Sequence, residues 1–182
     1  VLFTIGMSIN VFYFNTLNEF DLEFFQNPFF NKIISFSPFL ILLFPVLIAP
    51  IFEELAFRGW IQGSKKRQLL SIGLISFYTY QASNNIILTS TVSLLSFFII
   101  LKNKKNRLKI GIIYTSLIFG MVHINNYEIP MIQLGSISLI IGVGLILAYI
   151  AQKYTIIHSM AFHAVYNALI ILPLLLSMND AI

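Results

Sequence analysis

The sequence has no cysteine and few charged residues, and each shortage excludes a class of protein. Without cysteine, neither a disulfide framework nor a thiolate metal site is possible. Only 10% of the 182 residues are charged, whereas soluble domains average about 25%. Hydrophobic residues make up 58% of the chain, in runs too long and too continuous for alternating strands. The sequence therefore predicts an integral membrane protein built from helices.

The net charge of +4 is not interpreted as a nucleic-acid-binding signal, because the basic residues cluster beside apolar runs. Such clusters mark the cytoplasmic side of membrane proteins. They occur at Lys65–Arg67, Lys102–Lys109 and Lys153, whereas the acidic loop Glu19–Glu23 is expected on the opposite side. We expect the lipid bilayer to be a partner, nucleic acid not to be one, and the location to be a bacterial plasma membrane.

About seven membrane segments are predicted, in an all-α helical bundle that forms one domain over 1–182. Leu69–Leu101 is too long for one ordinary span, and a turn at Asn84 would divide it into a hairpin of two short helices. A single tilted helix would put basic clusters on opposite sides, which the positive-inside rule disfavours. The opening at Val1, within an apolar run, is compatible with a fragment that lacks earlier spans. The other predicted segments are Val1–Leu17, Ile33–Gly63, Ile110–Ile124, Met131–Gln152 and Ile156–Ser177.

The stretch Ile51–Trp60 places three charged side chains in one of these apolar segments. A charge at bilayer depth costs several kcal/mol unless it is paired or faces a cavity. Glu54 and Arg58 are four residues apart and share a helix face, so they can pair. Glu53 points about 100° away from Glu54. The pattern predicts a structural Glu54–Arg58 pair and leaves the carboxylate of Glu53 free for chemistry.

Other polar side chains are predicted at a similar depth. Counted from the nearest basic cluster at about 1.5 Å per helical residue, Glu53, His123 and His163 lie at about 18, 21 and 15 Å. Asn167 follows His163 by one turn on the same face. The estimate for Glu53 assumes that its helix continues to Lys65. On this count, three distant helices bring their polar groups to one level.

Three short motifs occur in this order: E-E-x-x-x-R at Glu53, Glu54 and Arg58, F-x-x-x-H at Phe119 and His123, and H-x-x-x-N at His163 and Asn167. Together they resemble the CPBP intramembrane peptidases, which include type II CAAX prenyl endopeptidases and bacterial proteins linked to bacteriocin processing and self-immunity. The resemblance covers about 39–172. The first and second motifs usually lie closer together in that family, so 69–101 looks like an inserted hairpin.

The resemblance implies that an activated water hydrolyses a peptide bond in a membrane-associated or lipidated peptide or protein. Glu53 would be the general base, and His123 would hold or activate the water. His163 and Asn167 would stabilise the oxyanion, with Glu54, Arg58 and Phe119 as supporting residues. Elementary chemistry agrees, because a carboxylate in an apolar site binds a proton readily and can pass it to the leaving amine.

The need for a metal ion is a separate question. Glu53, His123 and His163 could form a three-ligand zinc site of the catalytic type. The spacing is not H-E-x-x-H, however, and the sequence offers no second carboxylate cluster at this level. We therefore expect no obligatory metal, with zinc at these three residues as the alternative.

Two further functions stay open on the sequence alone. One is a non-catalytic membrane protein, such as a bacteriocin-immunity or scaffolding factor that keeps the fold. The other is a small transporter or proton channel, because a carboxylate and histidines within a membrane also suit proton relays. His158 belongs to no motif and is interpreted as structural.

Overall fold

The computed structural model describes residues 43–102, 107–123 and 130–179. Within these ranges it contains six α-helices, two short π-helical segments and no strand, so the all-α fold class is confirmed there. None of the helices in these ranges combines the length and the apolar character needed to cross a bilayer. The seven membrane segments therefore stay a prediction, and Val1–Leu17 and the acidic loop lie outside the described residues.

The chain divides into two compact units. One is Pro45–Ala168, and the other comprises residues 1–44 and 169–182. The described part of the second unit is short and includes the end of the last helix, α9 (Ile156–Asn179). The hydrophobic core and the candidate site both lie within Pro45–Ala168.

The helical segment that carries Glu53 ends earlier than the sequence predicts. Within the described residues it comprises the π-helical segment η1 (Phe44–Ile48) and α4 (Ala49–Phe57), with Arg58 as the C-cap, so the prediction of a helix to Gly63 is wrong. The N–H groups of Arg58 and Gly59 both bond to the carbonyl of Glu54, which closes the last turn. A Cβ at Gly59 would overlap the carbonyl oxygen of Leu55, so only glycine fits this tight closure.

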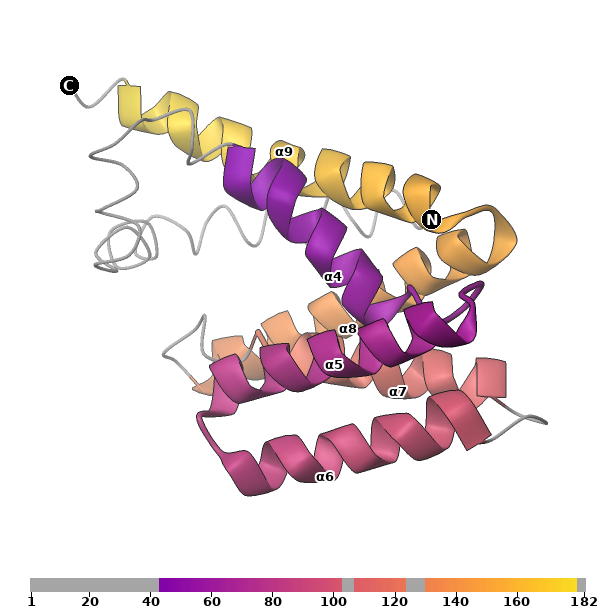
Figure 1. The fold of residues 1–182 in the computed structure, drawn as a ribbon. Coiled ribbons are helices and arrows are strands. Elements are labelled where there is room, and N and C mark those ends of the chain that lie inside the picture. The colour runs from indigo at the N-terminus through magenta and orange to yellow at the C-terminus, as the bar shows by residue number, and fades with distance from the viewer. Residues whose placement is uncertain (1–42, 103–106, 124–129, 180–182) are drawn as a thin grey trace. The chain divides into compact units, whose positions relative to one another are not determined.

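A hairpin of two helices follows. Helices α5 (Lys65–Ser83) and α6 (Ile86–Phe97) pack side by side (Figure 1) and turn at Asn84, the position that the sequence indicates. Asn84 adopts a left-handed conformation (φ 48°), which asparagine tolerates better than most residues. The side-chain oxygen of Asn85 accepts hydrogen bonds from Ile87 N and Leu88 N and caps α6. Whether this hairpin is an insertion stays a prediction.

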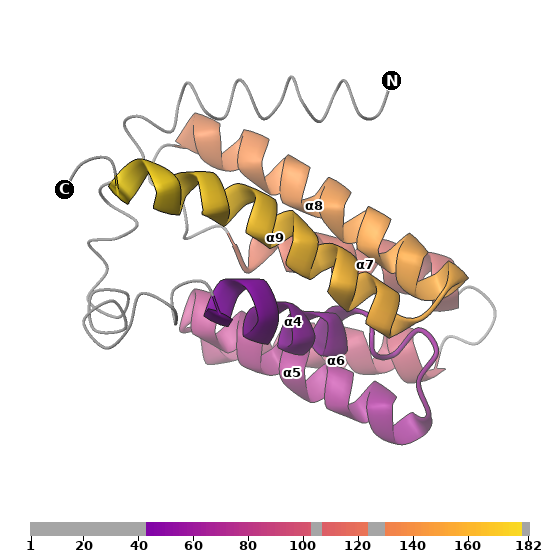
Figure 2. The same cartoon turned by 90° about the horizontal axis from the view of Figure 1, so that it is seen from above.

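The basic clusters gather at one end of the Pro45–Ala168 unit. Lys65–Arg67, which we expected to end the preceding helix, instead begin α5. The segment η2 (Phe98–Lys102) ends the hairpin, and α7 (Arg107–Met121) starts from the same end. Helix α8 (Pro130–Lys153) runs back along α7 and brings Lys153 there, beside the start of α9 (Figure 2). The hairpin therefore places Arg67 and Lys102 at the same end, as predicted.

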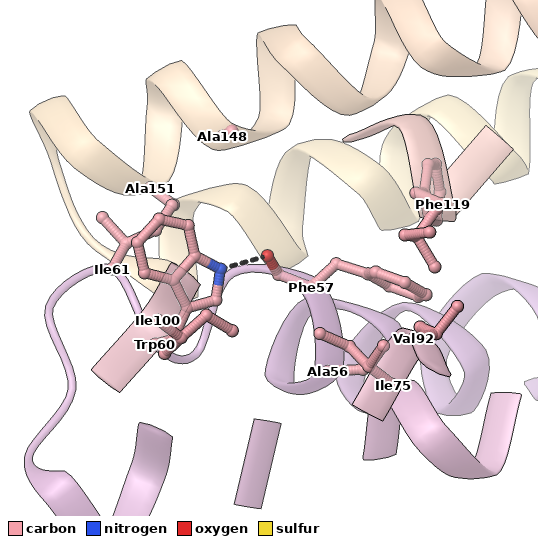
Figure 3. Close-up of a cluster of buried hydrophobic side chains, with 11 residues drawn as sticks. Ala56, Phe57, Trp60, Ile61, Ile75, Val92, Ile100, Phe119, Ala148 and Ala151 are labelled. Atoms are coloured by element: carbon pink, nitrogen blue, oxygen red, sulfur yellow. Dashed lines mark hydrogen bonds between the residues drawn. The ribbon is translucent and has the colours of Figure 1, made fainter. Parts of the chain in front are cut away.

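The core of this unit forms around Phe57 and Trp60, at and just beyond the end of α4. Both rings are fully buried, and the indole N–H of Trp60 donates a 2.9 Å hydrogen bond to the carbonyl of Phe57 (Figure 3). Phe57 also meets the ring of Phe119 edge-on, with centroids 5.2 Å apart. The remaining core side chains come from α5, α6, α8 and the segments next to them and include Ile75, Val92, Ile100, Ala148 and Ala151. The chain just after Glu53 and Glu54 is therefore fixed by close packing.

The packing of this core is tight where Gly111 of α7 meets the ring of Trp60. A Cβ there would overlap Cη2 of Trp60, whose rigid ring has no room to move, whereas a Cβ at Gly73 would meet nothing within 4 Å. Both glycines lie inside α-helices, so alanine improves helix propensity at each by up to about 1 kcal/mol. We expect Gly73→Ala to stabilise the protein slightly and Gly111→Ala to destabilise it by about 1–3 kcal/mol, as overpacked cores do. Chemical denaturation of both variants under one set of solvent conditions measures the difference. Equal stabilisation of both would show that Trp60 does not pack against Gly111.

Candidate functional site

The site is built around a buried ion pair at the end of α4. The side chains of Glu54 and Arg58 both have zero exposure, and Arg58 Nη1 donates to Glu54 Oε1 over 3.0 Å. The four-residue spacing predicts this pair, and the structure contains it. Removing one partner of a buried ion pair leaves the other as an uncompensated charge, which strongly destabilises the fold.

The guanidinium of Arg58 has further contacts on neighbouring helices. Its Nη2 donates to the carbonyl of Gly144 in α8 at 3.1 Å, and its Cζ lies 4.4 Å from the centroid of the Phe119 ring in α7. A Cβ at Gly144 would lie only 3.2 Å from both Nη2 and the Phe119 ring. The absence of a side chain at Gly144 therefore allows the cation to reach α8 and to stack on an aromatic face.

The carboxylate of Glu54 also receives two donors from α9. Ser159 Oγ donates to Oε2 at 2.6 Å, and His163 Nδ1 lies 3.0 Å from Oε1. Because a carboxylate can only accept, Nδ1 must carry the hydrogen. Sequence reasoning missed Ser159, although it lies four residues before His163 on the same helix face, which was the available signal. We call these four residues, Glu54, Arg58, Ser159 and His163, the Glu54 cluster.

Glu53 lies against the other side of the same imidazole. Its Oε2 is 3.6 Å from His163 Nε2, and the two side chains are 12% and 5% exposed. The distance is longer than a hydrogen bond but within ion-pair range. His163 is thus placed between two carboxylates, one of which is already paired with Arg58. The side chain of Glu53 thus keeps a small exposed fraction, unlike that of Glu54.

His123 lies two residues beyond the end of α7, not inside the helix as predicted. Its Nδ1 lies 2.7 Å from the carbonyl oxygen of Phe119, and because a carbonyl only accepts, Nδ1 carries the hydrogen. Nε2 of the neutral ring is then the basic nitrogen. The ring of Phe119 meets the imidazoles of His123 and His163 edge-on, with centroids 4.9 and 5.9 Å away. Phe119 therefore contacts both histidines.

Asn167 ties α9 to the start of the α4 segment. Its Nδ2 donates to the carbonyl of Pro45 at 2.7 Å. In a π-helical turn that carbonyl would accept from the residue five positions later, which is Pro50 and has no N–H. The side chain of Asn167 therefore satisfies an acceptor that proline leaves open. The second N–H of the same amide group is not needed for this bond.

The predicted residues are brought together in part, and one premise for grouping them is wrong. Five of the predicted side chains form a connected set, in which each contacts at least one of the others: Glu53, Glu54, Arg58, Phe119 and His163. The depth count for Glu53 assumed a continuous helix to Lys65, whereas α4 ends at Phe57 and a turn intervenes. His158 is exposed and bonds to Thr155, so it lies outside the cluster.

The proposed metal ligands do not form a ligand group. Across 43–102, 107–123 and 130–179, no three histidine or acidic side chains are placed so that they could hold a metal ion. The two ring nitrogens of His163 face Glu54 and Glu53. The set Glu53, His123 and His163 therefore does not fit a zinc site in this arrangement.

Comparison with known protein families gives a match over most of the chain. The family model described as Type II CAAX prenyl endopeptidase Rce1-like matches residues 35–169. The comparisons with curated proteins and with solved structures found no match. The matched range contains all three motifs and every residue of the Glu54 cluster.

The buried pair can be tested by a double-mutant cycle. Arg58→Met leaves the charge of Glu54 without its cation and should cost about 3–5 kcal/mol of unfolding free energy. Glu54→Gln combined with Arg58→Met removes both charges, so its cost should be smaller than the sum of the two single changes. Denaturant unfolding of Glu54→Gln, Arg58→Met and the double variant measures this coupling. Strictly additive costs would mean that the two charges do not depend on each other.

Proposed function

Since the chain belongs to the Rce1-like family of type II CAAX prenyl endopeptidases, we propose that it is a membrane-embedded endopeptidase in which a glutamate and a histidine activate water. This is a protease family whose members are typically membrane-associated. The observation that carries the proposal is the placement of Glu53 against His163, beside a second glutamate that is already neutralised by Arg58.

The charges of the site favour one shared proton. Glu54 and Arg58 cancel, so the pair of Glu53 and His163 must be neutral overall to avoid an unpaired buried charge. Two arrangements meet this condition: a protonated Glu53 beside a neutral imidazole, or a carboxylate beside an imidazolium. The second arrangement suits hydrolysis, because it supplies a base at Glu53 and a donor at His163 Nε2 at the same time.

In the proposed reaction the carboxylate of Glu53 takes one proton from water as the water oxygen bonds to the scissile carbonyl carbon. The basic Nε2 of His123 accepts a hydrogen bond from the same water and orients it, since Nδ1 is held by Phe119. Glu53 then gives its proton to the leaving nitrogen, the C–N bond breaks, and a carboxylic acid and an amine result. No oxidant or further reactant is required.

The oxyanion that forms on the carbonyl needs donors that are fixed in advance. His163 Nε2–H is one, because the bond from Nδ1 to Glu54 holds the ring in place. We assign the second N–H of the Asn167 amide as the other, while the first N–H donates to Pro45. Removing one such donor from other enzymes slows the reaction about 10²–10³-fold.

The proposed substrate is a lipidated or membrane-associated peptide, and the protein is proposed to be embedded in a bacterial plasma membrane with its basic end on the cytoplasmic side. This orientation is supported by the gathering of Lys65–Arg67, Lys102 and Lys153 at one end of the Pro45–Ala168 unit. The mechanism assigns proton transfer to Glu53 and orientation of the water to His123, and we propose that no metal ion is obligatory. Activity that survives dialysis against a chelator would support this.

The proposal predicts that Glu53→Gln lowers turnover about 10²–10⁴-fold, because the amide cannot accept the proton from water. The assay uses the protein in lipid vesicles and a synthetic peptide that ends in a prenylated Cys-aliphatic-aliphatic-X sequence. His158→Ala is the matched control, since this histidine is exposed and lies outside the site. It should keep turnover within about twofold of the parent.

Two results would count against the proposal. Glu53→Gln with parental turnover at matched expression would remove the catalytic role of the glutamate. A parent protein that cleaves no prenylated peptide, together with an immunity or scaffolding phenotype that survives Glu53→Gln, would favour the non-catalytic alternative.

A further inference from the structure

Ser159 is a buried hydroxyl that belongs to none of the three motifs. It has zero exposure and lies on α9, one turn before His163. Its Oγ is 2.6 Å from Glu54 Oε2 and 2.9 Å from the carbonyl oxygen of Leu147. A hydroxyl has one hydrogen, and the carbonyl of Leu147 lies inside α8, where the helix supplies its own donor. The shorter contact, typical of an O–H donor to an ionised carboxylate, therefore receives the hydrogen.

This hydrogen bond restricts the orientation of the Glu54 carboxylate group. Oε1 accepts from Arg58 Nη1 and from His163 Nδ1, both at 3.0 Å, whereas Oε2 has Ser159 as its donor. With donors on both oxygens, rotation of the carboxylate would break at least one bond. Without Ser159, Oε2 would be a buried acceptor with no donor among the described side chains, and the carboxylate could turn toward another partner.

We infer that Ser159 is a positioning residue: through Glu54 it holds the ring of His163 with Nε2 toward Glu53. The chain of contacts runs from Ser159 to Glu54, from Glu54 to His163 Nδ1, and from His163 Nε2 to Glu53. The inference rests on the proposed peptidase function, in which His163 Nε2 donates to the oxyanion. A hydroxyl on the same helix as His163 thus sets the direction of the donor.

The chain provides a matched control in Ser116. It is also fully buried in a helix, but its Oγ has no hydrogen-bond partner among the described residues. Replacing Ser116 or Ser159 by alanine removes the same atom from a buried position. Only Ser159→Ala removes a bond to the Glu54 carboxylate.

The kinetic experiment compares these two variants on the prenylated peptide in vesicles. Ser159→Ala should lower kcat about tenfold with KM nearly unchanged, because a bond to a charged group is lost and the ring of His163 is less well oriented for the transition state. Ser116→Ala should keep kcat within about twofold. Ser159→Cys keeps the side-chain volume but is a weak donor, so its kcat should also fall. Parental kcat in folded Ser159→Ala and Ser159→Cys would overturn the inference.

A second measurement does not depend on turnover. The chain has only three histidines, so ¹⁵N-histidine labelling gives a simple ring spectrum. The Nδ1 proton of His163 should resonate far downfield in the parent and in Ser116→Ala, and should shift or broaden in Ser159→Ala. An unchanged resonance in Ser159→Ala would overturn the positioning role. If Glu53→Gln keeps parental turnover while this resonance moves in Ser159→Ala, the proposed function fails and the structural link survives.

Discussion

The cost of burying the charge of Glu54 is the constraint on which the site depends. A carboxylate with no exposure must be surrounded by donors, and here they come from Arg58 at the end of α4 and from Ser159 and His163 on α9. Arg58 in turn reaches the backbone of α8 at Gly144. One charge therefore fixes the mutual positions of three helices. The ring of His163 is oriented as a consequence of this requirement.

A second connection between the α4 segment and α9 arises because proline has no backbone N–H. Pro50 cannot donate to the π-helical turn before it, and the open carbonyl of Pro45 accepts from Asn167. The two ties lie on either side of Glu53 along the α4 segment. Glu53 thus lies on a short piece of helix that is held at both ends, which suits a group that must meet a substrate in one geometry.

The sequence predicts which site residues come together better than it predicts where the helices that carry them end. Reading Ile33–Gly63 as one helix ignored the turn at Arg58–Gly59, where glycine is required by the close carbonyl of Leu55. The depth count consequently failed for Glu53, although Glu53 and His163 do lie together. The hairpin at Asn84 was predictable because the local conformation of asparagine decides it.

What the sequence alone determined is what short-range geometry decides: the all-α class, the Glu54–Arg58 pair at four-residue spacing, the turn at Asn84, and three motifs that carry the family resemblance. The tertiary structure alone decided that Ser159 completes the shell of Glu54 and that Asn167 reaches Pro45. These contacts join residues more than 100 positions apart. No local propensity encodes them, because they form only when packing brings α9 beside α4 and the buried polar groups of each must find partners.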